Sequence, residues 1–566
     1  MKKRIALLLC FILILPCLFL FASCGGDDAE ETTAATTEND GPYTVAFVAG
    51  DRETTVTVER GETPVFPEEL LSWETAEHYY KILGWDKEIV PAECDVTYTA
   101  TVGEYGLTLY DVLFVLPIGI VKVPTHEGEI PTPPKGYEID DTQEYKIGAF
   151  KEWNKELTAP TAENTENGSK KMSYVPVYTY SPRYVAKVLP AKDGAKGILT
   201  MTYDDGYYPT ALWVNQENKK YGLTGSCMLV PNWSKCNPDF TFDGASIAKW
   251  NAIFADGTLE PQSHSMSHEG KARLADESSS IWEECKYNNY QENYQYELVQ
   301  AVREFRKAFP QFSPICFAPS NNTLSHMSFK SDGNGNLVKE NGEYVLVDDG
   351  GATKVAEATY YAIRKGDRHT VQTLDPAPDG NAGGWYNLAI KAFKDYSGDE
   401  KLTQGKKWLD NAANTGTWLI VMCHKITETG GDIKQSLADQ FFAYASEYVK
   451  KGELWAATFS EATKYIRERQ GTTVSARFEN NAVLVDMKII RRTEEGKYLG
   501  ETIFNYPLTV EVRVPDTWKN VRYEDKGEVK TAAVYKHDGA SFAMVNLTPG
   551  ANGATVTTEV TRYVAN

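Results

Sequence analysis

The chain has 566 residues, 42% of them hydrophobic and 12% aromatic, which is enough for about three to five domains with real cores. Its formal net charge of −20 at pH 7 argues against binding of DNA, RNA or anionic lipid head groups through a basic surface. The six cysteines beyond Cys24 are scattered without a CxxC pair, so we expect most of them to be small buried hydrophobic residues.

The N-terminus carries the pattern of an export signal. Residues 1–4 are basic, residues 5–21 are apolar, and Ala22-Ser23-Cys24 ends the run. This pattern predicts a secretory signal over residues 1–23. It resembles a bacterial lipoprotein signal, which implies an exported protein held at the bacterial cell surface and membrane by a lipid on Cys24. A plain transmembrane anchor is the alternative.

The stretch after the signal is acidic and poor in large apolar residues. Residues 24–41 are mostly Asp, Glu, Thr and Ala, so they cannot bury a core and should form a flexible tether. Removal of residues 1–23 would take away three positive charges and move the formal net charge from −20 to −23.

Two similar segments of short alternating strands follow the tether. Gly61-Glu62-Thr63-Pro64 matches Gly128-Glu129-Ile130-Pro131, and Trp85-Asp86 matches Trp153-Asn154. The first copy resembles internalin-type B repeats, which implies a β-grasp-like module. We therefore predict one such repeat over residues 42–103 and a second, degenerate copy over 104–181. A surface spacer is the simplest role, and glycan or protein binding is the alternative.

The pattern changes again in the remaining residues. Over 182–471, apolar strand-like runs alternate with helix-like segments, which predicts a (β/α) barrel with a parallel core. Gly333–Gly350 is expected to be an inserted hairpin. Residues 472–566 return to period-two alternation and predict an accessory β-sandwich, with carbohydrate binding as an alternative role.

Acids and histidines stand where three of the predicted barrel strands end. Asp204-Asp205-Gly206 follows a buried run, His264 and His268 follow a later strand, and His424 follows the most apolar strand. Each motif alone is also typical of a surface turn or a structural histidine. Together they form an Asp-His-His ligand set for Zn²⁺ or a similar divalent ion. The second Asp-Asp-Gly, at 348–350, is not followed by such a set of histidines and is expected to end a hairpin.

The three motifs in this order carry a family resemblance. Thr202-Tyr203-Asp204-Asp205-Gly206, then His264-Ser265-Met266-Ser267-His268, then a late His424 after an apolar strand, resemble the NodB-type polysaccharide deacetylases of carbohydrate esterase family 4. The resemblance covers roughly residues 190–471. It implies a distorted (β/α) barrel that removes acetyl groups from polysaccharides. It also implies one bound divalent ion, for which Zn²⁺ is the first choice and Co²⁺, Ni²⁺ or Mn²⁺ are alternatives.

The resemblance also implies a role for each matched residue. Asp204 would be the general base that takes a proton from water, and His424 the general acid that protonates the leaving atom. The metal ligands would be Asp205, His264 and His268, with Ser265 supporting their loop.

The sequence departs from the family in its third and fourth motifs. Phe317-Ala318-Pro319-Ser320 stands in place of Arg-x-Pro-Tyr, so Pro319 is kept but the arginine that orients the base is missing. Arg364 or Arg368 could substitute for it, and the Ser320 backbone N–H could still serve as the oxyanion donor. The fourth motif is not recognisable. Trp385 is a candidate pocket wall, and a core position is the alternative.

These features predict a metal-dependent deacetylase that hydrolyses N- or O-acetyl groups on an extracellular or cell-wall glycan, with no nucleic-acid partner. One alternative is a surface glycan-binding or adhesion lipoprotein on a deacetylase scaffold that has lost activity. A further alternative keeps the barrel and changes the acyl group or the substrate.

Overall fold

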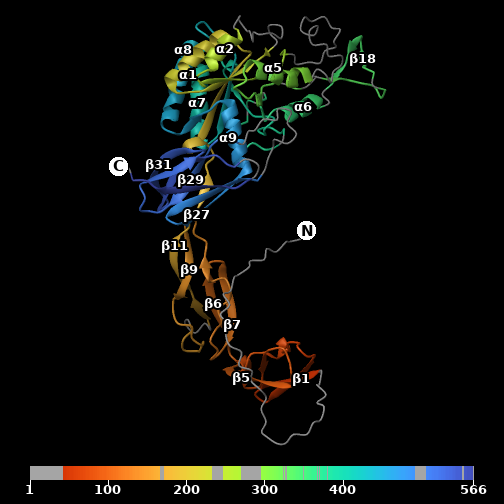
Figure 1. Ribbon diagram of the computed structural model, residues 1–566, viewed down its shortest axis with the longest axis vertical. Helices are drawn as coiled ribbons and strands as arrows, with labels where there is room; N and C mark the ends of the chain where they lie inside the picture. The colour runs from red at the N-terminus through yellow and green to blue at the C-terminus, as the bar shows by residue number, and fades with distance from the viewer. Residues whose placement is uncertain are drawn as a thin grey trace, which may run out of the picture. The chain divides into compact units, whose positions relative to one another are not determined.

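The computed structural model (Figure 1) describes residues 42–564 with gaps at 166–170, 232–245, 269–294, 323, 325–327, 335, 348–349, 366–367, 369, 379, 491–504 and 551–553. The expected signal and tether, and the second Asp-Asp pair, lie outside the described residues. Among those described, no helix is both long enough and apolar enough to cross a membrane. The chain divides into two compact units: Met1–Glu138 with Phe150–Val177, and Ile139–Ala149 with Tyr178–Asn566.

The first module of the N-terminal unit is a five-stranded sheet with the order β2-β1-β5-β4-β3 among its described residues. β1 and β5 are parallel, and the other neighbours are antiparallel. The inward residues of β1 alternate with outward ones, so one face packs a small core. The strands are β1 (Tyr43–Ala49), β2 (Arg52–Val58), β3 (Ser72–Glu74), β4 (His78–Trp85) and β5 (Val96–Gly106), with a 3-10 turn at Glu68–Leu70.

The second module repeats this strand arrangement. β6 pairs antiparallel with β7 and parallel with β10, as β1 pairs with β2 and β5. β8 pairs antiparallel with β9. The strands are β6 (Leu109–Leu116), β7 (Gly119–His126), β8 (Ile139–Asp140), β9 (Lys146–Trp153), β10 (Lys171–Tyr174) and β11 (Pro176–Pro182).

Equivalent aromatic side chains make equivalent contacts in the two modules. In the first, the Phe47 ring centroid lies 5.0 Å from that of Trp85 and 5.5 Å from that of Tyr98. In the second, Phe114 lies 5.1 Å from Trp153 and 5.6 Å from Tyr174. The turn after each tryptophan is also held alike: Asp86 Oδ1 and Asn154 Oδ1 accept backbone N–H groups of Thr99 and Val175 at 2.8 and 2.9 Å, respectively. The two segments are therefore built on one plan.

The larger unit contains a parallel sheet with the order β21-β16-β15-β14-β13-β23-β22 in its described part, and β26 pairs with β13. Every neighbouring pair in it is parallel. The sheet curls, because Arg364 after β21 bridges Leu388, and Lys391 a few residues later pairs with Val421 of β23. The strands are β13 (Gly197–Asp204), β14 (Gly225–Leu229), β15 (Leu259–Ser263), β16 (Cys316–Phe317), β21 (Ala362–Ile363), β22 (Lys391–Ala392), β23 (Trp418–Cys423) and β26 (Leu454–Ala456).

Helices cover the outside of this sheet (Figure 1). β13 and β23 are buried along their whole length, as expected for strands inside a helix-covered parallel sheet. α1 and α7 end at Gly222 and Gly416, both in the left-handed conformation that favours glycine. The helices are α1 (Tyr208–Tyr221), α2 (Ile247–Phe254), α5 (Ala301–Ala308, preceded by a π-helical turn at Gln295–Gln300), α6 (Gly351–Thr359), α7 (Glu400–Thr415), α8 (Gln435–Lys450) and α9 (Phe459–Gly471).

An antiparallel sheet follows, with the order β12-β29-β32-β31-β30-β33-β28-β27 among the described residues. Its first strand, β12 (Ala186–Val188), pairs with β29 and comes from the stretch that the sequence assigned to the barrel. Its inner face shares one core with α9 of the preceding domain. The other strands are β27 (Thr472–Glu479), β28 (Ala482–Ile489), β29 (Leu508–Val514), β30 (Asn520–Asp525), β31 (Glu528–His537), β32 (Ala540–Leu547) and β33 (Val556–Arg562).

Two smaller features complete the unit. The expected insertion is a pair of short antiparallel ladders, formed by β17 (Ser328–Phe329) with β20 (Leu346–Val347) and β18 (Lys339–Glu340) with β19 (Glu343–Tyr344). Of the cysteines in the described part, Cys227, Cys316 and Cys423 are buried and unpaired, as predicted, whereas Cys94 is exposed.

Candidate active site

The two acids of the first motif lie where β13 ends. Asp204 is the last residue of the strand and is 3% exposed, and Asp205 follows it with a left-handed backbone, φ 73°. Ser265 and His268, after β15, are also left-handed, with φ of 67° and 63°. Non-glycine residues adopt this region at a cost, and such residues cluster at functional sites. The backbone therefore turns sharply at Asp205 and His268, two of the predicted ligands, and at Ser265, which follows the third.

Asp205, His264 and His268 form one cluster. Asp205 Oδ1 lies 3.3 Å from Nε2 of His264 and 3.4 Å from Nε2 of His268. Two ligands about 2.1 Å from one tetrahedral ion would be about 3.4 Å apart, so the spacing suits a zinc-sized ion. Asp205 Oδ1 is buried and accepts no hydrogen bond from the residues that the structure describes, so its lone pairs are available to a cation. The predicted Asp-His-His ligand atoms are thus brought together, and their chemistry fits a divalent ion.

The surroundings select the protonation states that a metal needs. His264 Nδ1 lies 2.7 Å from the Ala318 carbonyl oxygen, which can only accept, so Nδ1 carries a proton and Nε2 is the nitrogen that faces Asp205. Burial raises the pKa of Asp205, but the two neighbouring histidines outweigh it and hold the pKa below its usual range. The carboxylate is therefore ionised at neutral pH.

Hydrogen bonds hold the loop that carries the histidines. Ser265 Oγ accepts the His268 backbone N–H at 3.0 Å and lies 3.0 Å from Ser320 Oγ. Ser265 thus ties the loop backbone at His268 to the loop after β16. The buried carboxylate of Glu297 accepts the Ser267 N–H at 3.0 Å and also the Ser267 hydroxyl. Glu297 was not anticipated, because nothing in its local sequence marks it as a partner of a loop thirty residues away.

Asp204 is paired with an arginine from another strand. Arg364 follows β21, is fully buried, and donates from Nη2 to Asp204 Oδ1. Arg368, the other candidate, forms an ion pair with Asp395 instead. Of the two arginines considered, Arg364 is thus the one that contacts the predicted base, and it does so from the end of β21.

We expect replacement of Arg364 by Met to destabilise the protein strongly. It would leave the buried Asp204 carboxylate without its partner, which typically costs about 3–5 kcal/mol. Urea unfolding of the purified variant measures this loss. The double variant Asp204→Asn/Arg364→Met should lose less, because no charge is then left unpaired. Arg368→Met, whose ion pair is partly exposed, is the matched control. Equal stability of Arg364→Met and Arg368→Met would contradict the role of the pair.

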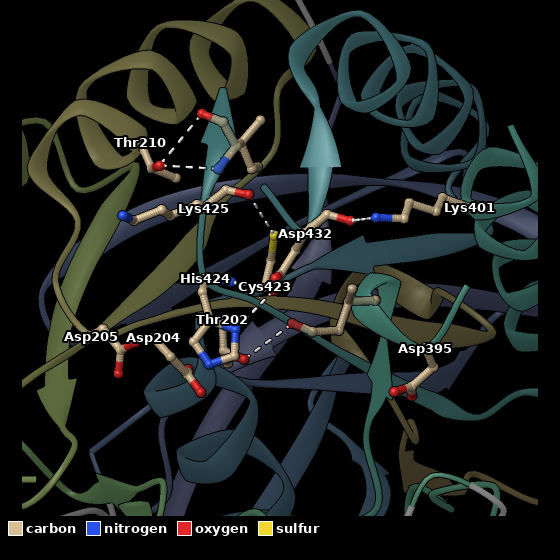
Figure 2. A network of polar contacts seen from close by, with 12 residues as sticks. Thr202, Asp204, Asp205, Thr210, Asp395, Lys401, Cys423, His424, Lys425 and Asp432 are labelled. Atoms are coloured by element: carbon tan, nitrogen blue, oxygen red, sulfur yellow. Dashed lines mark hydrogen bonds and ion pairs between the residues drawn. The ribbon is translucent and has the colours of Figure 1, made fainter. Parts of the chain in front are cut away.

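His424 follows β23 and is oriented by an aspartate that the sequence did not reveal. Asp432 Oδ2 lies 2.8 Å from His424 Nδ1 and accepts the His424 backbone N–H at 2.7 Å. Figure 2 shows the His424 ring between Asp432 and the side chain of Asp204. Burial lowers the pKa of His424, but the hydrogen bond to Asp432 and the charge of Asp204 raise it above its ordinary value.

A tight fold-back brings Asp432 to His424. β24 (Ile426–Thr427) and β25 (Ile433–Lys434) pair across the intervening turn, and the Asp432 N–H donates to the Lys425 carbonyl at 2.8 Å. Gly431 has φ 85°, and any Cβ there would collide with the same carbonyl oxygen. The Gly430-Gly431-Asp432 stretch was the only local signal of this turn.

The remaining candidates lie at different depths. Ser320 is buried beside the ligand loop, with its Oγ 3.0 Å from Ser265 Oγ, and Pro319 precedes it in the buried loop after β16. Trp385, in contrast, is a core residue: its side chain is 1% exposed, its Nε1 donates to Gln470 Oε1 at 3.1 Å, and Arg467 covers its ring. The pocket-wall interpretation of Trp385 therefore gives way to the core alternative.

Comparison with known proteins gives distant likenesses. No family model matches the chain. It is 19% identical to a gellan lyase from Bacillus sp over 372 residues, which make up 64% of this chain and only 13% of that protein. Among solved structures, it is similar to a polysaccharide deacetylase from Mycobacterium smegmatis (10% identity, 50% of this chain and 95% of that one, TM-score 0.33). It is also similar to a chitin deacetylase from Colletotrichum lindemuthianum (15% identity, 49% of this chain and 90% of that one, TM-score 0.28). A third similar structure is a family 4 carbohydrate esterase from Streptomyces lividans (11% identity, 46% of this chain and 93% of that one, TM-score 0.25).

Proposed function

We propose that this protein is a metal-dependent hydrolase that removes acetyl groups from a polysaccharide. The observation that carries the proposal is the arrangement around Asp205, His264 and His268. An oriented carboxylate, Asp204, and an oriented histidine, His424, both stand beside this metal-ligand cluster. A base and an acid on either side of an electrophilic centre are what hydrolysis of an acyl group requires.

Each side chain would have a distinct task. Asp204, fixed by Arg364, accepts a proton from the attacking water. His424, fixed by Asp432, is held protonated by its raised pKa and delivers that proton to the departing sugar nitrogen or oxygen. The backbone N–H of Ser320 would stabilise the oxyanion of the tetrahedral intermediate. A divalent ion on the Asp-His-His cluster would polarise the carbonyl and lower the pKa of water.

The substrate and the location are proposed from the sequence motifs. The motif order resembles polysaccharide deacetylases, which favours an N- or O-acetylated glycan. The N-terminal pattern favours an exported, lipid-anchored protein that meets this glycan outside the cell. Zn²⁺ is the first choice of ion, because the site offers two imidazoles and one carboxylate with tetrahedral spacing.

The alternative of an inactive glycan-binding protein loses part of its support at this site. It was based on the missing arginine and the missing fourth motif. Arg364 now contacts the base and Asp432 contacts the acid, each from an unexpected place in the chain. Buried charged pairs cost desolvation free energy, so a site that has lost its activity would gain nothing from two such pairs at the predicted base and acid.

Metal content and acetate release test the proposal together. The purified protein should retain one divalent ion per chain, and it should release acetate from at least one of peptidoglycan, chitin oligomers and acetylated xylan. Bound metal without acetate from any of the three would favour the binding protein or a different acyl group.

We expect Asp432→Asn to move the alkaline limb of the pH–rate profile to lower pH. Protonated His424 is the active form, so activity falls as pH rises through its pKa. Burial lowers the pKa of His424, and the hydrogen bond to Asp432 raises it. Without that hydrogen bond, the pKa of His424 in the variant should fall. At neutral pH the rate should drop about tenfold to a hundredfold. Asp439→Asn, a surface carboxylate on α8, is the control. A uniform loss with an unshifted limb would contradict this role.

A further inference from the structure

The first β module contains a cavity of about 260 Å³ that the catalytic residues do not border. Its floor is formed by Phe47 and Ala49 of β1, which are 1% and 5% exposed. Phe66 and Trp73 form aromatic walls. A space of this size is smaller than the roughly 300–1,000 Å³ of pockets for drug-sized ligands, so it suits a single ring.

The second module has a larger side chain at one position that lines this space in the first. The hairpins of the two modules share one register: Ala49 pairs with Arg52, and Leu116 pairs with Gly119 at the same positions. Thus Leu116, which is 5% exposed and belongs to the second core, stands where the first module has Ala49. Leucine in one copy fills volume that alanine leaves open in the other, and unfilled volume forfeits packing contacts.

A second pair of equivalent positions also has the less apolar side chain in the first module. Phe47 pairs with Thr54 in the first hairpin, and the equivalent Phe114 pairs with Val121 in the second. Val121 packs against the core of its module, whereas Thr54 lines the cavity with a hydroxyl. The first copy is therefore both wider and more polar at this end of the hairpin.

The rim of the cavity carries polar groups of both signs. Arg52 lies with its guanidinium carbon 4.7 Å from the centre of the Trp73 ring, and Glu53 is its neighbour. Within the described residues, the side chains of Arg52, Glu53 and Thr54 make no hydrogen bond or ion pair. Donors and acceptors are thus available beside an aromatic surface, and their charges offset each other.

We propose that this cavity binds one pyranose ring of a neutral polysaccharide and tethers the protein to its substrate. The apolar face of a sugar matches the aromatic walls, and its hydroxyls match the Arg52, Glu53 and Thr54 groups. Opposite charges on the rim favour a neutral ligand over an anionic one. The choice of a polysaccharide rests on the proposed function, and the cavity gives the N-terminal repeats a binding role in place of a pure spacer.

The second module supplies the variants for the test. Ala49→Leu and Thr54→Val copy Leu116 and Val121, and the former should fill the cavity without unfolding the module, because leucine already fits the same position in the second copy. Thr57→Val makes the same chemical change as Thr54→Val on the exposed face of the same strand and serves as the control. Arg52→Gly, which copies Gly119, removes the guanidinium without adding volume.

Binding of the full chain to particulate chitin and to insoluble acetylated xylan is measured by co-sedimentation in an Asp204→Asn background, which prevents turnover. Ala49→Leu and Arg52→Gly should each weaken binding to at least one polymer by about tenfold or more, and Thr57→Val should not. Unchanged binding by a folded Ala49→Leu variant, or no binding of the parent chain to either polymer, overturns the proposal.

Acetate release separates this result from the proposed catalysis. With Asp204 restored, Ala49→Leu should release acetate from short soluble oligomers at the parent rate, because none of the proposed catalytic residues lines the cavity. Intact binding with no acetate release would refute the deacetylase proposal and leave the sugar site standing. Acetate release by the parent chain, together with unaltered polymer binding by Ala49→Leu, would refute the sugar site and leave the deacetylase proposal standing.

Discussion

Asp204→Asn should reduce acetate release by about 10²–10⁴-fold, the usual contribution of a general base, while the protein keeps its metal. Asparagine has nearly the same shape and can still accept the hydrogen bond from Arg364, but it leaves the buried Arg364 charge without a counter-charge, so urea unfolding of the variant accompanies the rate measurement. What it cannot do is take a proton from water. The measurement combines initial rates of acetate release with metal content of the same samples.

Two comparisons make the result specific to Asp204. Asp348→Asn changes the first acid of the other Asp-Asp-Gly sequence and should leave the rate unchanged. Asp205→Asn changes the neighbouring acid and should lose metal as well as rate, because Asp205 is a proposed ligand. Retention of acetate release in Asp204→Asn would remove this residue from the base role.

His268→Ala should abolish metal retention and activity together. It removes one of three protein ligands, and outer-shell changes alone cost about 10–100-fold in metal affinity, so loss of a ligand should exceed that range. His268 is the most exposed ligand of the three, with a side chain 23% exposed, so its truncation should disturb packing least. Equilibrium dialysis gives the affinity directly.

Chelation of the parent protein should reproduce the same defect reversibly. An ion present at 100 times its dissociation constant stabilises the folded state by about 2.7 kcal/mol, so removal should lower the unfolding temperature and addition should restore it. His268→Ala should show no such response. His537→Ala, an exposed histidine on β31, is the matched control and should behave like the parent. A chelated enzyme that still releases acetate would exclude a metal role.

The metal-ligand cluster could be predicted from the sequence because its signals are local. An apolar run followed by Asp204-Asp205 marks a strand end, and His264 and His268 lie within five residues of each other. Parallel strands deliver their carboxyl ends to one edge of a sheet, so residues at successive strand ends converge. The left-handed backbone of Asp205, Ser265 and His268 refines this convergence, but it does not create it.

The partners of Asp204 and His424, the predicted base and acid, depend on contacts between distant parts of the chain. Asp204 and Arg364 are 160 residues apart, and their contact depends on the curl of the sheet and the register of β21. Asp432 reaches His424 only through the fold-back between β24 and β25. Arg364 and Arg368 were equivalent in the sequence, and the curled sheet directs one to the base and the other to Asp395.

The amino-acid pattern was enough to predict the parallel core and the clustering of Asp205, His264 and His268, because binary patterning and strand-end chemistry are local properties. Four features could be seen only in the folded chain: the contact of Arg364 with Asp204, the contact of Asp432 with His424, the burial of Trp385 and the pairing of β12 with the C-terminal sheet. The fold also leaves a cavity beside Ala49 in the first hairpin. These outcomes depend on which distant side chains share a volume, and no periodicity along the chain encodes that.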